Sequence, residues 1–158
     1  MAYLKLQQGR AIDVVPNDEI NIPSPSAVSA VGVNESDGTS IVDSTKDFTK
    51  SVKIGDVVYN TTSLKIAKVI SIDSADTVTI SDDIFTSGVG DGYKIFSTTD
   101  IRTEACVLYT GSGGTIRVIT SSGDDVTFKT AAAGIVLPVQ VVRVLSADTT
   151  ATGLVALW

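Results

Sequence analysis

Short runs of alternating apolar and polar residues, each ended by turn-forming residues, follow one another along most of this chain. Residues 115–120 alternate cleanly, and residues 64–72 and 77–81 flank an Asp-Ser-Ala-Asp turn at residues 73–76. Two such runs around a four-residue turn predict a β-hairpin. No stretch keeps the 3.6-residue period of an amphipathic helix, so the pattern predicts an all-β, antiparallel protein.

The same pattern predicts further strands, one helical turn and one glycine-rich turn. Residues 43–48 favour a helical turn because Asp43 or Ser44 can cap its free N–H groups. Residues 111–114, Gly-Ser-Gly-Gly, predict a hairpin turn. The remaining predicted strands cover residues 11–16, 28–33, 39–42, 57–59, 93–96, 105–109, 126–129, 135–138, 139–145 and 153–158.

Two prolines divide the chain near its start. Pro23 and Pro25 fix their own φ angles and push the preceding residues into extended geometry, which predicts a stiff linker over residues 23–26. Residues 27–97 then hold five or six short strands, which is typical of a small β-barrel of SH3-like or OB-like type. Residues 98–158 form stronger strands, which are typical of half a β-sandwich or of a trimerising β module.

Composition and charge limit the classes of partner that this chain can bind. The chain has 158 residues, of which 43% are hydrophobic and 19% charged, so it can bury a core. The formal net charge of −6 argues against nucleic acid and anionic membranes, because phosphate groups are bound by clustered Lys and Arg. The longest apolar stretch, near residues 131–139, is interrupted and too short to span a bilayer. We expect no nucleic-acid partner and no membrane partner.

Candidate chemistry is sparse. There is no histidine, which removes the commonest general base and zinc ligand, and the single Cys106 lies in an apolar strand, where we expect an inert thiol. The glycine-rich turn at residues 111–114 lacks the Lys-Ser/Thr of a phosphate-binding loop. We therefore predict no enzyme, and no catalytic, cofactor-binding or metal-binding residue. Five aspartates are predicted to bond to the backbone of their own turns, namely Asp82, Asp83, Asp91, Asp124 and Asp125.

The last strand, residues 153–158, is apolar on both faces. Leu154, Ala156 and Trp158 alternate with Val155 and Leu157, so the strand is covered on both sides, either within the protomer or by another subunit. Both explanations stay open at this point. The predicted subunit interface consists of Leu154, Val155, Leu157 and Trp158.

Several segments together resemble a known family. The opening Ala-Ile-Asp-Val-Val-Pro-Asn-Asp at residues 11–18, the strands at residues 105–111 and 115–120, and the ending at residues 149–158 occur in a familiar order. In this order they are similar to the spike-base family of tailed phages and phage-derived gene transfer agents. The resemblance implies a small β-rich virion protein without catalytic residues, in which the arm of residues 1–26 packs with residues 98–158.

The middle of the chain departs from this family, because residues 27–97 appear as an insertion between the resembling segments. The resemblance implies a capsid decoration or a spike or fibre base, located in the virion and made in the host cytoplasm. It implies a homotrimer whose partners are the major capsid protein, other virion proteins or a spike or fibre protein. A neck, tail or fibre-adaptor protein is a second hypothesis. A virion-attached carbohydrate-binding module or glycan hydrolase is a third, although few aromatic residues are present to stack on sugars, namely Tyr3, Tyr59, Tyr93, Tyr109 and Trp158.

Overall fold

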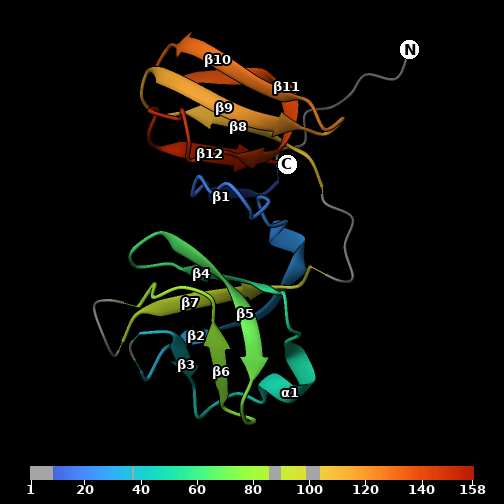
Figure 1. Ribbon diagram of the computed structural model, residues 1–158, viewed down its shortest axis with the longest axis vertical. Coiled ribbons are helices and arrows are strands. Elements are labelled where there is room, and N and C mark those ends of the chain that lie inside the picture. The colour runs from blue at the N-terminus through green and yellow to red at the C-terminus, as the bar shows by residue number, and fades with distance from the viewer. Residues whose placement is uncertain (1–8, 37, 86–89, 99–103) are drawn as a thin grey trace. The chain divides into compact units, whose positions relative to one another are not determined.

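The computed structural model describes residues 9–36, 38–85, 90–98 and 104–158. The chain separates into two compact units (Figure 1). The terminal unit combines the start of the chain up to Ile22 with Glu104–Trp158, and the inserted unit covers Pro23–Thr103. Each unit contains one six-stranded antiparallel sheet, so the predicted all-β, antiparallel fold class is confirmed.

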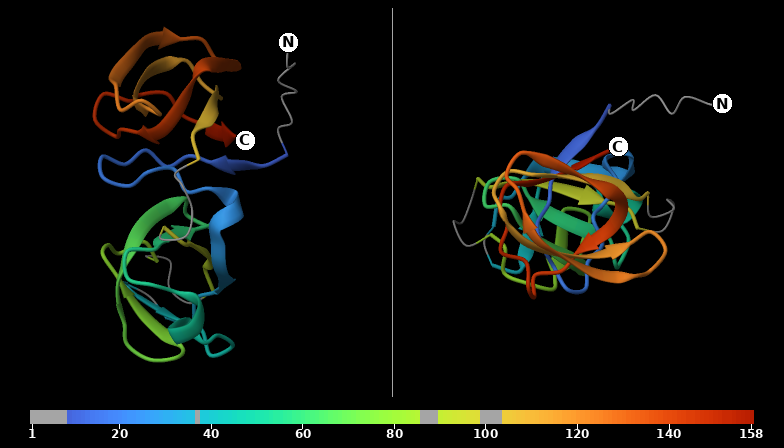
Figure 2. Two further views of the ribbon diagram at one scale, coloured as in Figure 1. Left: turned by 90° about the vertical axis from the view of Figure 1, so that its right-hand side faces the viewer. Right: turned by 90° about the horizontal axis from the view of Figure 1, so that it is seen from above.

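The terminal unit is built from six strands in the order β1-β12-β8-β11-β9-β10. The first strand of the chain pairs with the last, because Ala11 lies opposite Leu157 and Asp13 opposite Val155. The sheet curls round its own core, as the left view of Figure 2 shows. The strands are β1 (Ala11–Asp13), β8 (Cys106–Thr110), β9 (Gly114–Thr120), β10 (Asp125–Ala131), β11 (Ile135–Val144) and β12 (Leu154–Leu157).

The long strand β11 is the element that lets this sheet curl. Its first half pairs with β8 and its second half with β9, and Val141 takes part in both ladders. The register shifts between Leu137 and Val141, where Pro138 lies. Because proline cannot donate to a ladder, it is accommodated where the pairing is interrupted. The two runs predicted around Pro138 are therefore one bent strand.

The core of the terminal unit lies on the inner face of this sheet. Leu108, Ile116, Val118, Val141 and Ala156 are each fully buried there, at 0% exposure. Along β9, buried residues alternate with half-buried ones, which is the period of two expected from the sequence.

The segment after β1 is stitched to the C-terminal part of the same unit. The N–H of Val14 donates to Leu154, that of Asn17 to Val144 and that of Ile22 to Val142. These bonds place the first part of the chain against its last part, with the whole inserted unit between them in sequence.

The inserted unit has its six strands in the order β2-β7-β4-β5-β6-β3. Its core contains Phe48, Val58, Val78, Tyr93 and Ile95, all at 0% exposure. The strands are β2 (Val28–Val33), β3 (Ser40–Val42), β4 (Val57–Asn60), β5 (Lys65–Ile72), β6 (Thr77–Ile80) and β7 (Gly92–Phe96). The hairpin predicted around residues 73–76 is confirmed, since it joins β5 to β6.

Two local predictions are wrong. The helical turn is α1 (Phe48–Ser51), which follows Asp47 without a side-chain cap, because Phe48 is drawn into the core and fixes the turn there. The glycine-rich turn at residues 111–114 does not close a hairpin, because β8 and β9 are separated by β11 in the sheet. The division between the two units falls between Ile22 and Pro23, at the start of the predicted linker, and Pro25 opens the short 3-10 helix η1 (Pro25–Ala27), capped by Ser24.

Candidate functional site

The predicted interface residues of β12 separate onto two faces of the terminal sheet. Leu154 is 3% exposed and lies in the core, so it is not available to a partner. Val155 and Leu157 lie on the outer face and are half-buried. The Trp158 ring packs against the edge of the core, and its Nε1 donates to the carbonyl of Glu104 at 3.1 Å.

The outer-facing residues of β12 belong to a row of apolar side chains that crosses three neighbouring strands. Val155 lies opposite Tyr109 of β8, which in turn lies opposite Val136 of β11. In the next row, Leu157 lies opposite Val107. Tyr109 is 37% and Val136 45% exposed. We call these five residues the apolar outer face. An exposed group of apolar residues of this kind is typical of a binding surface.

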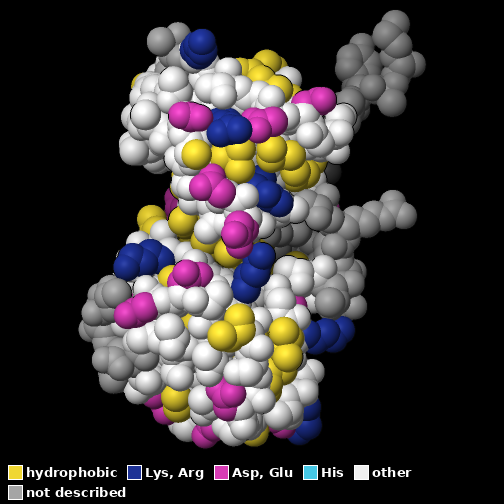
Figure 3. Space-filling view, in the orientation of Figure 1, with side chains coloured by type: hydrophobic (Ala, Val, Ile, Leu, Met, Phe, Trp, Pro, Cys, Tyr) yellow, Lys and Arg dark blue, Asp and Glu magenta, His cyan; other side chains and the backbone are white. Residues whose placement is uncertain are grey.

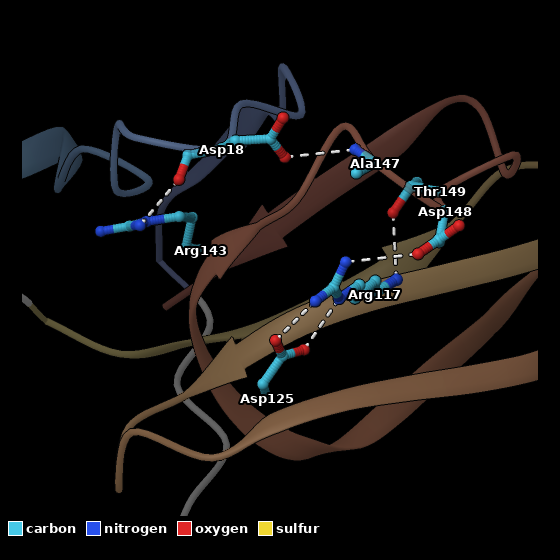
Figure 4. A network of polar contacts seen from close by, with 7 residues as sticks. All are labelled: Asp18, Arg117, Asp125, Arg143, Ala147, Asp148 and Thr149. Carbon is cyan, nitrogen blue, oxygen red and sulfur yellow. Dashed lines mark hydrogen bonds and ion pairs between the residues drawn. The ribbon is translucent and has the colours of Figure 1, made fainter.

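A network of charged and polar groups lies elsewhere on the terminal unit, and Figure 4 shows it from close by. Arg117 of β9 donates two hydrogen bonds to the carboxylate of Asp125 on β10. One comes from Nε at 2.9 Å and the other from a terminal nitrogen at 2.8 Å. Its other terminal nitrogen donates to Asp148 at 3.2 Å. The Arg117 side chain is 32% exposed, so water screens these ion pairs.

Asp18 extends this network to the segment that follows β1. Its carboxylate accepts from Ser146 Oγ at 2.7 Å and from the Ala147 N–H at 3.1 Å. Arg143 of β11 donates to the Asp18 carbonyl at 2.9 Å, as Figure 4 shows. It also donates to the Asn21 side chain at 2.8 Å. These contacts clamp the start of the terminal unit to the loop that follows β11.

The network lowers the pKa of two of its carboxyl groups. Hydrogen bonds from Ser146 and Ala147 lower the pKa of Asp18 below its ordinary value of 3.8. The hydrogen bond and charge of Arg117 lower the pKa of Asp125 in the same way. Both carboxyl groups are therefore ionised at neutral pH and accept hydrogen bonds. A carboxylate in this state stabilises the local structure and has no proton to give as a general acid.

The bonds of the candidate aspartates differ from the predicted bonds to the backbone of their own turns. Asp82 accepts from the neighbouring Ser81 hydroxyl, and Asp124 accepts from the Thr120 hydroxyl across its own turn. Asp125 instead forms the ion pair with Arg117 described above. Asp91 is 6% exposed and accepts from the Asn60 side chain at 2.9 Å inside the inserted unit. The partners of Asp125 and Asp91, which are Arg117 and Asn60, are brought to them by the tertiary fold. The local sequence pattern does not encode these contacts.

Cys106 lies where the sequence predicts an inert thiol. The side chain is 1% exposed and its Sγ donates to the Val141 carbonyl at 3.4 Å. Burial raises the pKa of the thiol to about 12, so little thiolate is present at neutral pH.

Aromatic residues give little support for a sugar platform. Tyr59 and Tyr93 are buried, and Trp158 is half-buried against the core. Among the aromatic residues that the structure describes, Tyr109 is the exposed one; Tyr3 lies outside the described residues.

Charges of both signs are interspersed on the face drawn in Figure 3, with no continuous basic field. Across the described part of the chain, no three acidic, cysteine or histidine side chains are grouped so that they could hold a metal ion. In the same residues, no helix is long and apolar enough to cross a membrane.

Sequence reasoning missed the polar network altogether. Asp18 and Arg117 come from two separate parts of the chain and Arg143 and Asp148 from a third, and only the sheet topology brings them together. One signal was present: Arg117 interrupts an apolar strand, and a lone arginine with a polar neighbour on the next strand is a candidate for a cross-strand pair.

No protein-family model, no curated protein and no solved structure matches this chain.

Proposed function

We propose that this chain is a structural protein of a tailed-phage particle, a capsid decoration or a spike or fibre base, and that it acts by binding and assembly. The observation that carries the proposal is the pairing of β1 with β12. The resemblance to spike-base proteins rests on the first part and the last part of the chain. Those same parts fold together into one unit around one core.

The apolar outer face supplies a surface for assembly. Tyr109 and Val136 lie side by side on neighbouring strands, and both are more than a third exposed. Covering such residues with another virion protein removes apolar area from water, and each square ångström contributes about 25 cal/mol. The surface therefore favours a protein partner, such as a major capsid protein or a fibre protein, over a small charged ligand.

The proposal is tested on gradient-purified phage particles whose genome encodes this chain. The proteins of these particles are identified by mass spectrometry. We expect the chain in the particle fraction, at a fixed ratio to the major capsid protein. Its presence only in the soluble host fraction would contradict a virion role. An electron cryo-microscopy map of the same particles distinguishes a head position from the neck, tail or fibre-adaptor position of the second hypothesis.

A rebinding experiment tests the apolar outer face itself. Particles lacking the chain are mixed with purified wild-type protein or with Tyr109→Asp, which places a charge on this face. We expect the variant to rebind at least tenfold more weakly. Val31→Asp is the matched control, because Val31 is 48% exposed on the inserted unit. Equal loss of binding in both variants would exclude the apolar outer face as the contact.

A further inference from the structure

The strand β10 is a free edge of the terminal sheet. It pairs with β9 and with no other strand of the described chain. Asp125, Val126 and Thr127 are all exposed. An exposed edge strand presents unpaired main-chain groups to which another strand can add. This edge is therefore a candidate binding site for an extended segment of polypeptide.

The ladder between β9 and β10 shows which main-chain groups face outward. Its register is continuous over residues 125–128. At its start, the Thr120 N–H donates to the Asp124 carbonyl, so these two residues form a hydrogen-bonded pair. Hydrogen-bonded pairs recur at every second position of an antiparallel ladder, so the even-numbered residues of this range bond to β9. The N–H and C=O groups of Asp125 and Thr127 consequently point away from β9, toward the free edge.

The inner face of this edge is apolar and incompletely covered. Val126 lies opposite Val118 of β9. Val118 is 0% exposed in the core, whereas Val126 is 37% exposed, because no strand lies beyond it in the described sheet. Phe128, the next inner-facing residue of β10, packs at the margin of the core and is half-buried. An added strand would remove this apolar surface from water if its own inner face were apolar.

The outer face of the same edge carries a surplus of negative charge. Arg117 bonds to both Asp125 and Asp148, so two carboxylates share one guanidinium (Figure 4). The side chain of Asp148 is 71% exposed and can be reached from solvent. The next cation along β10, Lys129, lies beyond the continuous register and has an interaction of its own. A cationic side chain on the outer face of an added strand would meet this surplus.

We propose that β10 binds, by strand addition, an extended segment of another protein in which apolar residues alternate with Lys or Arg. The main chain of this segment bonds to the outward groups of Asp125 and Thr127. Its apolar side chains lie beside Val126, and its cations lie beside Asp125 and Asp148. In such a complex the main-chain bonds hold the segment, and the side chains on its two faces select it.

A second copy of β10 fits this edge less well. Within the continuous register, its own outer face carries Asp125 and Thr127 and no cation. Pairing two copies would bring two negatively charged clusters together, and like charges on adjacent strands are destabilising. The complementary partner is therefore a different segment, cationic on one face.

NMR titration of the full chain tests the strand addition residue by residue. The probe is the peptide acetyl-Lys-Val-Lys-Val-Lys-amide, followed through the backbone N–H signals of the protein. We expect the signals of Asp125 and Thr127 to shift most, and those of Val126 and Phe128, whose N–H groups bond to β9, to shift less. Two control peptides should bind at least tenfold more weakly. In acetyl-Asp-Val-Asp-Val-Asp-amide the charge is reversed, and in acetyl-Lys-Pro-Lys-Pro-Lys-amide the cations stay but proline cannot donate to a ladder.

Two protein variants separate the main-chain bonds from the charges. Thr127→Pro removes an outward N–H without touching the β9 ladder, so it should weaken binding of the valine–lysine peptide at least tenfold while the circular dichroism stays unchanged. Asp148→Asn should weaken binding of the same peptide at least threefold. Asp83→Asn, an equal charge change at an exposed residue of the inserted unit, should not.

Absence of any shift at millimolar peptide would overturn the proposal. Equal binding of the valine and proline peptides, or unchanged binding by Thr127→Pro, would do so too, because the contact would then rest on charge alone. Dimerisation of the protein by itself, lost in Thr127→Pro, would show that a second copy occupies the edge and would also overturn it. The virion role is separate from this result, since it rests on the presence of the chain in particles.

Discussion

Inside the inserted unit, the hydroxyl of Tyr93 donates a hydrogen bond of 2.7 Å to Oδ2 of Asp43, which lies 50 positions earlier in the chain. Both residues are buried, at 0% and 3% exposure. Burial alone would raise the pKa of Asp43, but hydrogen bonds from Thr45 and Tyr93 outweigh it and lower the pKa. The pair ties β7 to the turn after β3.

We expect Tyr93→Phe to lower the free energy of unfolding by about 1–3 kcal/mol, because it leaves a buried carboxylate oxygen without this donor. Chemical denaturation monitored by circular dichroism measures the change. Tyr109→Phe is the control, since Tyr109 is exposed and its loss of a hydroxyl should change stability by less than about 0.5 kcal/mol. Equal stability of both variants would show that the Tyr93–Asp43 bond contributes nothing.

Because Gly32 of β2 has no side chain, there is room beside it for the Tyr93–Asp43 pair. A Cβ at this position would lie 2.6 Å from the Tyr93 hydroxyl oxygen and still closer to the Asp43 carboxylate. Gly32→Ala should therefore destabilise the protein by about 1–3 kcal/mol, as overpacking of a core does. Gly9→Ala, with no atom within 4 Å of the new Cβ, should not. Thermal denaturation of the two variants makes the comparison.

The ion pair between Arg117 and Asp125 should make stability depend on pH in the acid range. The pKa of Asp125 is lowered in the folded protein, so its stabilising effect is fully present above the ordinary value of 3.8. That effect is lost as the pH falls through the lower folded-state pKa. Asp125→Asn should consequently be less stable than the wild type at neutral pH, with the difference vanishing in strong acid.

Denaturant titrations at several pH values measure this difference for Asp125→Asn. Asp83→Asn serves as the control with the same change in charge, because Asp83 is exposed and lies outside the network. A constant difference between Asp125→Asn and the wild type at every pH would contradict the assignment.

Trp158 should stabilise the terminal unit through packing more than through its hydrogen bond. Because the ring is half-buried, Trp158→Ala should cost about 1–3 kcal/mol, less than a fully buried tryptophan does. Trp158→Phe loses the bond from Nε1 to the Glu104 carbonyl but keeps an aromatic ring, so it should cost about 1 kcal/mol. Calorimetry of both variants separates the two contributions, and equal costs would assign the effect to the hydrogen bond alone.

The terminal unit should fold without the inserted one. Its core and its ladders connect residues on both sides of the insertion, and β1 needs only β12 as its neighbour. Joining Ile22 to Glu104 with a short Gly-Ser turn should give a protein with a β-type circular dichroism spectrum and a cooperative thermal transition. A product that is unfolded, or is degraded at once by protease, would show that the two units depend on each other.

The sequence by itself determined the all-β class, the positions of most strands and the buried thiol. The alternation of Ile116, Val118 and Thr120 with half-buried neighbours decides which face of β9 turns inward, whatever the topology. The β5–β6 hairpin was predictable for a similar reason, because its turn is local.

Only the tertiary structure decided which strands are neighbours, because pairing depends on contacts far apart in the chain. The turn at residues 111–114 looks like a hairpin, yet β11 separates β8 from β9. Arg117 meets Asp125 nearby but also Asp148, 31 positions later. The free edge of β10 is likewise invisible in the sequence. A strand is an edge only because no other strand lies beside it, and that depends on how the whole sheet closes, not on the residues of the strand.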